Sequence, residues 1–305
     1  GWSDQLAYGM RVPGTKGIMS KGVPNFVFKH TDEFFPNDLE DLERKLKANR
    51  LTGGTAAVYL EPMGPESGTR PVSREFVRGA ARLARQYGAL LIFDEVVTGF
   101  RIGLSGAQGY FGVDPDLTVF GKIIAGGYPG AGGVGGHADC MAHLGAGLDS
   151  SGKKVPKAMC GGTMAATPIS CAAGYYTLCE IERTNACETA GRMGDRLTRG
   201  LQALIKQYHL PFVAFNQGSI CHLDNAGTMH FSIDWKKPWT IPGILKETGI
   251  RQKEMEHMGA AYMAEGIVTL AGSRLYTSAA YTEEMIDDVL ARFERVLANC
   301  GPVEG

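Results

Sequence analysis

The sequence predicts an α/β fold, with a mostly parallel sheet flanked by helices and a smaller C-terminal α+β domain. Two apolar runs, at residues 55–60 and 89–94, enclose an amphipathic helical pattern. A strand, a helix and a second strand in this order form a right-handed unit with parallel strands. After residue 185 long helices alternate with short strands. We therefore expect a large domain over residues 1–185 and a small domain over residues 186–305.

Composition limits the class of protein. The chain has 305 residues, of which 44% are hydrophobic and 21% are charged, as in a globular protein with a sizeable core. The net charge of −1 favours neither nucleic acid nor an anionic membrane surface, and no apolar run approaches the ~20 residues that span a bilayer. Seven cysteines, an odd number without paired spacing, are typical of reduced thiols. We expect a cytoplasmic protein without nucleic-acid or membrane partners.

The N-terminal elements follow from local patterns. Residues 1–36 show no period and are expected to be irregular. Asn37 is expected to cap a helix over residues 38–49, which has acids in its first turn and a lysine in its last. After the first strand and a loop, Ser73 opens an amphipathic helix that ends at Gly88.

Further strands are expected at residues 116–122 and 132–136. From Thr167 the pattern becomes helical, with an apolar helix over 168–183 that is expected to be buried and an amphipathic helix over 188–210. The remaining predicted elements are short strands between 212 and 233, a helix over 253–265, short strands at 266–272 and 274–280, and a terminal helix capped by Thr282.

The stretch from residue 89 to residue 136 carries the candidate chemistry. Its first apolar run ends on Asp94, and the apolar run of the next strand ends on Lys122. Because ligands of α/β sheets bind at the carboxyl ends of the strands, we expect an acid and an amine in one pocket. A lysine with dry surroundings loses part of its preference for charge and becomes a usable nucleophile. Taken singly, each residue also fits a solvated side chain at a strand end.

Two segments suggest phosphate binding. In residues 160–174, two glycines and Thr163 precede a helix, and backbone N–H groups with a helix dipole favour an anion. The pair Gly121–Lys122 resembles the end of an ATPase phosphate loop. That alternative is excluded, because Asp116 stands where the loop requires glycine and Ile123 stands where it requires Ser or Thr.

Together, these motifs resemble one family. DEVVTGFR at 94–101, the glycine-rich segment 106–136 and GGTMAATPISCAAG at 161–174 are similar to class III aminotransferases, and most to their glutamate-1-semialdehyde aminomutase-like branch. The resemblance implies fold type I, pyridoxal 5′-phosphate as cofactor and a homodimer with the active site at its interface. The implied reaction moves an amino group from an amino acid or amine to a keto or aldehyde acceptor through a lysine aldimine. An intramolecular transfer of the aminomutase type and an inactive truncated remnant are the alternatives.

The resemblance also assigns roles around the cofactor ring. Lys122 would form the aldimine with the cofactor aldehyde and shuttle a proton between substrate and cofactor. Asp94 would pair with the pyridine nitrogen and keep it protonated, which makes the ring an electron sink. Val96 would pack on one face of the ring. Asp94 and Lys122 are therefore the predicted catalytic residues.

Three further cofactor-binding residues are implied by the resemblance. Glu61, in an EP pair after the first strand, would lie near the phenolic oxygen of the cofactor or near the substrate. Thr163, preceded by Gly162, would contact the phosphate, in this family usually across a dimer interface. The family also carries a phosphate loop ahead of the position of Gly1, so we expect the chain to lack the N-terminal portion. Tyr281 stands where the family has a histidine on the substrate side, which predicts a different substrate preference.

Overall fold

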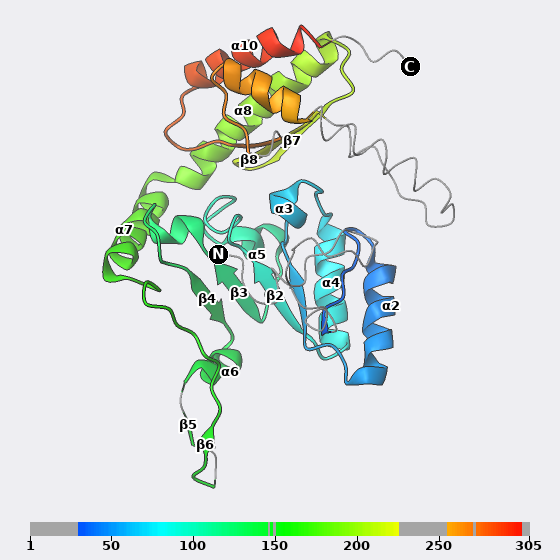
Figure 1. Ribbon diagram of the computed structural model, residues 1–305, viewed down its shortest axis with the longest axis vertical. Coiled ribbons are helices and arrows are strands. Elements are labelled where there is room, and N and C mark those ends of the chain that lie inside the picture. Colours follow the sequence, from blue (N-terminus) through cyan, green and yellow to red (C-terminus); the bar gives the residue numbers. More distant parts are fainter. Residues whose placement is uncertain (1–29, 146, 149–150, 226–254, 271–272, 301–305) are drawn as a thin grey trace. The chain divides into compact units, whose positions relative to one another are not determined.

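The computed structural model describes residues 30–145, 147–148, 151–225, 255–270 and 273–300 (Figure 1). It divides into two compact units. The first consists of Gly1–Phe93 with Val113–Leu117, and the second of Asp94–Gly112 with Thr118–Gly305. Among the residues that the structure describes, no helix has the length and apolar content to cross a membrane.

The first unit contains the predicted strand–helix–strand arrangement. Strand β1 (Ala57–Leu60) leads through a loop to helix α4 (Arg74–Gln86) and then to strand β2 (Leu90–Asp94). The two strands pair in parallel, with Val58 opposite Leu91. The predicted parallel unit is therefore confirmed. The short helix α3 (Pro65–Gly68) lies in the intervening loop.

Helix α4 covers this unit with one apolar face. Phe76, Val77, Ala80 and Ala84 recur at helical spacing and are all buried. Helix α2 (Leu39–Asn49) contacts α4 and is followed by the 3₁₀ turn η2 (Arg50–Thr52). Burial of one face of each helix is what stabilises this layer.

Of the two helix caps predicted in the first unit, one is confirmed and one is wrong. The Phe76 backbone N–H donates to Ser73 Oγ at 3.0 Å, as predicted. Helix α2, however, is capped by Asp38, whose Oδ1 accepts from the Asp41 N–H at 2.8 Å. Asn37 cannot serve because its backbone is left-handed, with φ 63°, and its side chain accepts from the Ser73 N–H.

A four-stranded sheet has the order β1-β2-β3-β4, where β3 is Leu117–Phe120 and β4 is Gly133–Gly136. Asp116 bonds twice to Leu91: its N–H donates to the Leu91 carbonyl at 2.9 Å, and its Oδ2 accepts from the Leu91 N–H at 2.7 Å. These bonds explain why an acid precedes β3. The strands predicted at 116–122 and 132–136 are confirmed as β3 and β4, but β3 ends at Phe120, so Lys122 follows the strand and does not end it.

Long helices and an antiparallel sheet make up the C-terminal part of the second unit (Figure 1). Helices α7 (Pro168–Thr184) and α8 (Ala186–Gln207) are separated by Asn185, which is left-handed with φ 50°. The sheet has the order β7-β8-β9. Its strands are β7 (Val213–Gln217), β8 (Ile220–Asp224) and β9 (Arg274–Tyr276). A helical segment at residues 255–264 and helix α10 (Glu283–Leu297) also belong to this part of the chain.

These elements share one core, whose fully buried side chains come from α8, β8, the 255–264 segment and α10: Leu201, Cys221, Tyr262, Phe293 and Leu297. The cap at Thr282 is confirmed, since its Oγ1 accepts from the Met285 N–H at 3.3 Å. The predicted strand at 266–272 is wrong for its described residues, because the chain turns back at Ser273 and only Leu270 forms a bridge, to Arg274. The domain boundary at residue 185 stays a prediction.

A β-hairpin lies between strand β4 and helix α7 in the sequence. It pairs β5 (Gly147–Leu148) with β6 (Lys154–Val155) in antiparallel register. Helix α6 (Ala138–Met141) and the 3₁₀ turn η4 (Ala142–Leu144) precede it.

Truncation of Leu201 tests the C-terminal core. Leu201 is fully buried, so Leu201→Ala should lower the free energy of unfolding by about 2–5 kcal/mol through lost burial and a cavity. Urea denaturation followed by circular dichroism measures this. The matched control is Leu51→Ala, since Leu51 is 90% exposed. Equal stability of the two variants would show that α8 does not pack as described.

Candidate active site

Asp94 is the last residue of β2, at the carboxyl end of a strand whose residues Leu91 and Phe93 are buried. Its side chain is half-buried, and Oδ1 accepts a hydrogen bond from the Val96 N–H at 2.9 Å. This short local bond limits the directions in which the carboxylate can point.

The next residue, Glu95, is only 1% exposed. Its carboxylate accepts hydrogen bonds from the Thr98 hydroxyl at 3.0 Å, the Ala107 N–H at 2.7 Å and the Gln108 N–H at 3.2 Å. Its own N–H donates to the Val119 carbonyl in β3 at 2.9 Å. Glu95 therefore joins the end of the acid strand to β3 and to the start of α5 (Gly106–Phe111).

This arrangement requires a glycine at position 106. Gly106 has φ +55°, and a Cβ there would lie 2.1 Å from Glu95 Oε2. Any side chain would push the carboxylate away from the two backbone N–H groups of α5.

Lys122 begins the 3₁₀ turn η3 (Lys122–Ala125), directly after β3 and Gly121. It is exposed and has φ +50°, a left-handed conformation that is unusual for lysine. Such positions cost free energy and cluster at functional sites. The strained backbone supports a specific role for this lysine.

Val96 connects the two predicted catalytic residues. A Cβ on Gly121 would lie 3.2 Å from Val96 Cγ1, so the Val96 side chain packs on the backbone next to Lys122. The ring of Phe100 also lies 5.9 Å from that of Phe120, centroid to centroid. The structure thus places the turn after Asp94 against the residues that lead into Lys122.

Gly162 and Thr163 lie in an exposed turn in which the Ala165 N–H donates to the Gly162 carbonyl at 2.9 Å. The following Ala166 N–H donates to the Gly130 carbonyl at 2.6 Å. The predicted phosphate segment is thereby tied to the loop that follows Lys122.

Helix α7 holds the lysine turn by close backbone contact. A Cβ on Gly174 would lie 2.0 Å from the Ile124 carbonyl oxygen, and one on Gly126 would lie 2.5 Å from the Ala173 carbonyl. Both positions therefore need glycine, and η3 is confined between α7 on one side and Val96 on the other.

Glu61 belongs to the first unit. It directly follows β1 and is half-buried, and its carbonyl accepts from the Gly64 N–H at 2.9 Å. The other five predicted site residues lie in the second unit.

A family model for aminotransferase class-III matches residues 9–297. The chain belongs to the class-III aminotransferase family. It is 35% identical to a glutamate-1-semialdehyde 2,1-aminomutase from Pyrobaculum neutrophilum over 278 residues, which cover 90% of this chain and 60% of the relative. It is 34% identical to glutamate-1-semialdehyde 2,1-aminomutase 2 from Geobacillus kaustophilus, covering 92% and 60%. The chain therefore spans about 60% of the length of these relatives.

Solved structures agree on the fold. An ω-transaminase from Sphaerobacter thermophilus is similar with a TM-score of 0.75 and 25% identity, covering 93% of this chain and 60% of its own. A transaminase with PLP bound has a TM-score of 0.75 at 22% identity, covering 98% and 64%. The predicted fold-type I architecture is confirmed.

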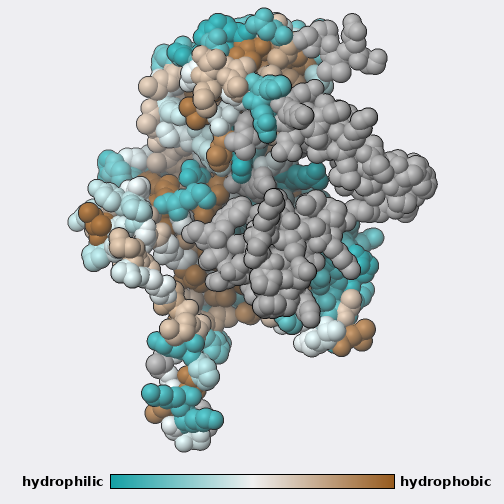
Figure 2. Space-filling view, in the orientation of Figure 1, coloured by the Kyte–Doolittle hydropathy of each residue, from teal (hydrophilic) through white to brown (hydrophobic). Residues whose placement is uncertain are grey.

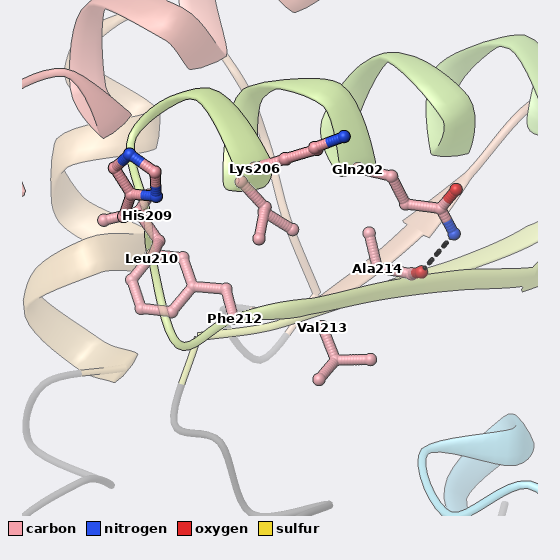
Figure 3. A pocket seen from close by; sticks show the side chains of 8 residues that line it. Gln202, Lys206, His209, Leu210, Phe212, Val213 and Ala214 are labelled. Carbon is pink, nitrogen blue, oxygen red and sulfur yellow. Dashed lines mark hydrogen bonds between the residues drawn. The ribbon is translucent and has the colours of Figure 1, made fainter.

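One pocket of this aminotransferase-family chain lies away from the predicted residues. It is a shallow hollow of about 550 Å³ between the C-terminal turn of α8 and β7 (Figure 3). Gln202 Nε2 donates to the Ala214 carbonyl at 2.9 Å at its edge. None of the predicted site residues lines it.

Sequence reasoning missed the roles of Glu95 and of the glycines at 126 and 174. The helix that Glu95 caps is too short for a periodic signal. The one clue in the sequence is the pair of adjacent acids at the strand end, of which only one can point toward a ligand.

Glu95→Gln tests the buried cap. The amide would turn an NH₂ group toward N–H donors and lose a charge-assisted acceptor, so the free energy of unfolding should fall by about 1–3 kcal/mol. Glu188→Gln is the control, because Glu188 is 73% exposed on α8 and surface changes have effects within about 0.5 kcal/mol. Denaturant unfolding measures both. A Glu95→Gln variant as stable as the control would contradict the structural role.

Proposed function

We propose that this chain forms the cofactor-binding part of a pyridoxal-phosphate-dependent aminotransferase. The reaction transfers an amino group from an amino acid or amine to a keto or aldehyde acceptor. The observation that carries this proposal is the contact of the Val96 side chain, two residues after Asp94, with the backbone of Gly121, the residue before Lys122. Membership of the class-III aminotransferase family supports it.

The residues present fit pyridoxal phosphate. The Asp94 carboxylate suits the ring nitrogen, the Val96 side chain offers an apolar surface to a ring face, and the Lys122 amine suits the aldehyde. Gly162, with φ +156°, and the Thr163 hydroxyl offer donors for the phosphate. When bound, the cofactor supplies an electron sink for the carbon that carries the amino group.

The side chains then divide the work. Asp94 holds a proton at the ring nitrogen, and the Val96 N–H keeps the carboxylate oriented. Lys122 Nζ takes the proton from the substrate carbon and returns it, acting as general base and acid. Confinement of η3 by α7 fixes the backbone from which Lys122 extends, which matters because small misplacements of a reacting group lower the rate.

Two assignments concern the edge of the site. We propose that Glu61 lies near the phenolic oxygen of the cofactor or near the substrate, which its place at the carboxyl end of β1 supports. We propose that Thr163 serves the active site of a second copy, which its exposure supports.

A homodimer is part of the proposal. Helix α7 is rich in apolar residues, yet Tyr176 is 71% exposed and Ile169 and Tyr175 are also exposed. Figure 2 shows hydrophobic side chains between hydrophilic ones on the β5–β6 hairpin, where Leu148 and Val155 are exposed. Exposed apolar surface, here on a helix and on a hairpin, is typical of an interface.

Intramolecular amino transfer is the second candidate, because relatives at 34–35% identity are named aminomutases. The two reactions use the same lysine and differ in whether the keto product leaves between half-reactions. An inactive remnant remains the alternative from another class. We also propose the cytoplasm as the location, on the odd number of cysteines.

Lys122→Ala tests the lysine. The purified protein should bind pyridoxal phosphate covalently, give a visible absorption band and become labelled at Lys122 on borohydride reduction. The variant should lose both, while Lys206→Ala, an exposed lysine of α8, should keep them. Retention of the band by Lys122→Ala would refute the assignment. Absence of the band in the folded wild type would support the remnant. Turnover without added keto acid would favour the mutase.

Tyr176→Glu tests the dimer surface. A charge on this exposed face should be buried without a partner in the dimer and weaken association at least about tenfold. Light scattering across a dilution series measures it. Met285→Glu on α10, also exposed, is the control. A wild type that stays monomeric at every concentration would rule the surface out.

A further inference from the structure

Arg101 lies on the turn that follows Asp94 and has an unusual environment. The side chain is half-buried, and its Nε is shielded from solvent with no hydrogen-bond partner in the part of the chain that the structure describes. Its Cζ lies 5.2 Å from the ring centroid of Tyr276 in β9. The cation therefore contacts an aromatic face and lacks an acidic partner among the described residues.

The other arginines whose ion pairs are described differ from Arg101. Each has a carboxylate within 3.2 Å or closer: Arg44, Arg183, Arg192, Arg196, Arg292 and Arg295. Burial lowers the pKa of the Arg101 guanidinium, and Tyr276 partly opposes this. From an ordinary value so far above neutrality, the group stays charged. A buried guanidinium N–H without an acceptor is costly, and more so on a cation with no described counter-charge.

The backbone around Arg101 is held in place. Its N–H donates to the Thr98 carbonyl at 3.1 Å, and its carbonyl accepts from the Ser219 hydroxyl at 3.4 Å. The Phe100 carbonyl accepts from Cys187 Sγ at 3.1 Å, and Phe100 has φ +57°. A side chain on so constrained a turn is pre-organised for binding.

The same turn belongs to the proposed active site. Thr98 and the Gly99 N–H both bond to Glu95, the neighbour of Asp94. The Phe100 ring packs on Phe120, which precedes Gly121 and Lys122. Arg101 therefore lies on the turn that carries Asp94, and this turn contacts the end of β3, just before Lys122.

A purely structural role is the competing explanation. Stacking of Arg101 on Tyr276 is worth roughly 0.5–1 kcal/mol at exposed sites and up to about 2 when desolvated, and it could serve packing alone. It leaves the buried Arg101 Nε–H without an acceptor among the described residues, however. A guanidinium fork matches a carboxylate in shape and charge better than it matches any other common group of metabolites apart from phosphate.

We propose that Arg101, stacked on Tyr276, binds a carboxylate of the substrate, so that the enzyme prefers amino acids with a free carboxylate to simple amines. This inference rests on the proposed aminotransferase function, since it names the substrate class of that site. Tyr276 keeps the guanidinium plane fixed, and the carboxylate supplies the missing counter-charge.

A matched pair of ligands tests the proposal. Isothermal titration of the cofactor-loaded protein with 5-aminopentanoate and with pentylamine compares the same amine with and without a carboxylate. The wild type should bind 5-aminopentanoate at least about tenfold more tightly, as expected for a charge-assisted pair. Arg101→Gln should lose most of this preference and keep its affinity for pentylamine. Arg101→Lys retains the charge but lacks the planar guanidinium. Its preference for 5-aminopentanoate should lie between that of the wild type and that of Arg101→Gln.

The controls separate this inference from the proposed function. Arg192→Gln removes an exposed arginine of α8 and should keep the preference. Titration with glutarate, which has no amine, reports the carboxylate site whether or not the cofactor binds. One outcome separates the two proposals: the wild type shows no cofactor band, and only the Arg101 variants fail to bind glutarate. This outcome would refute the aminotransferase function and support the carboxylate site at Arg101. A wild type without carboxylate preference, or Arg101 variants that retain it, would overturn the proposal.

Discussion

The candidate site depends on the buried carboxylate of Glu95. Its carboxylate accepts three hydrogen bonds, which connect the end of β2 to Thr98 and to the first turn of α5. Its backbone N–H also fixes Val119 of β3. These bonds help to fix the turn that carries Asp94 relative to β3, which leads through Gly121 to Lys122. A buried acid is costly unless its oxygens are fully satisfied, and the start of a helix satisfies them with backbone N–H groups.

Steric restriction does the same for the lysine. Gly121 admits Val96, and Gly126 and Gly174 let the lysine turn and α7 approach until their backbones touch. The high glycine content around residues 121–136 is therefore not a sign of flexibility here. Each of these glycines removes a side chain so that a neighbouring backbone or side chain can occupy the space. The left-handed backbone of Lys122 is tolerated because it is confined on both sides.

Much of this could be predicted from the sequence, because local patterns determine it. Periodic burial marked α4 and β2, and hydroxyl caps marked Ser73 and Thr282. The motif resemblance identified Asp94 and Lys122 as the pair to examine. The failures have a common cause: Asn37 bonds to a residue 36 positions away, and Glu95 bonds to a helix too short to show a period. Such contacts depend on tertiary placement, which a window along the chain does not contain.

In the turn from Asp94 to Arg101, three charged residues have three different environments. The Glu95 carboxylate is buried inside the protein, where backbone N–H groups donate hydrogen bonds to it. Asp94 accepts a local hydrogen bond from the Val96 N–H, at the strand end where ligands bind. Arg101 is held against an aromatic ring that cannot neutralise it. Since all three lie on one rigid turn, any change that moves Glu95 shifts both remaining charges together. In the proposed enzyme, cofactor binding and substrate preference would both depend on this buried carboxylate.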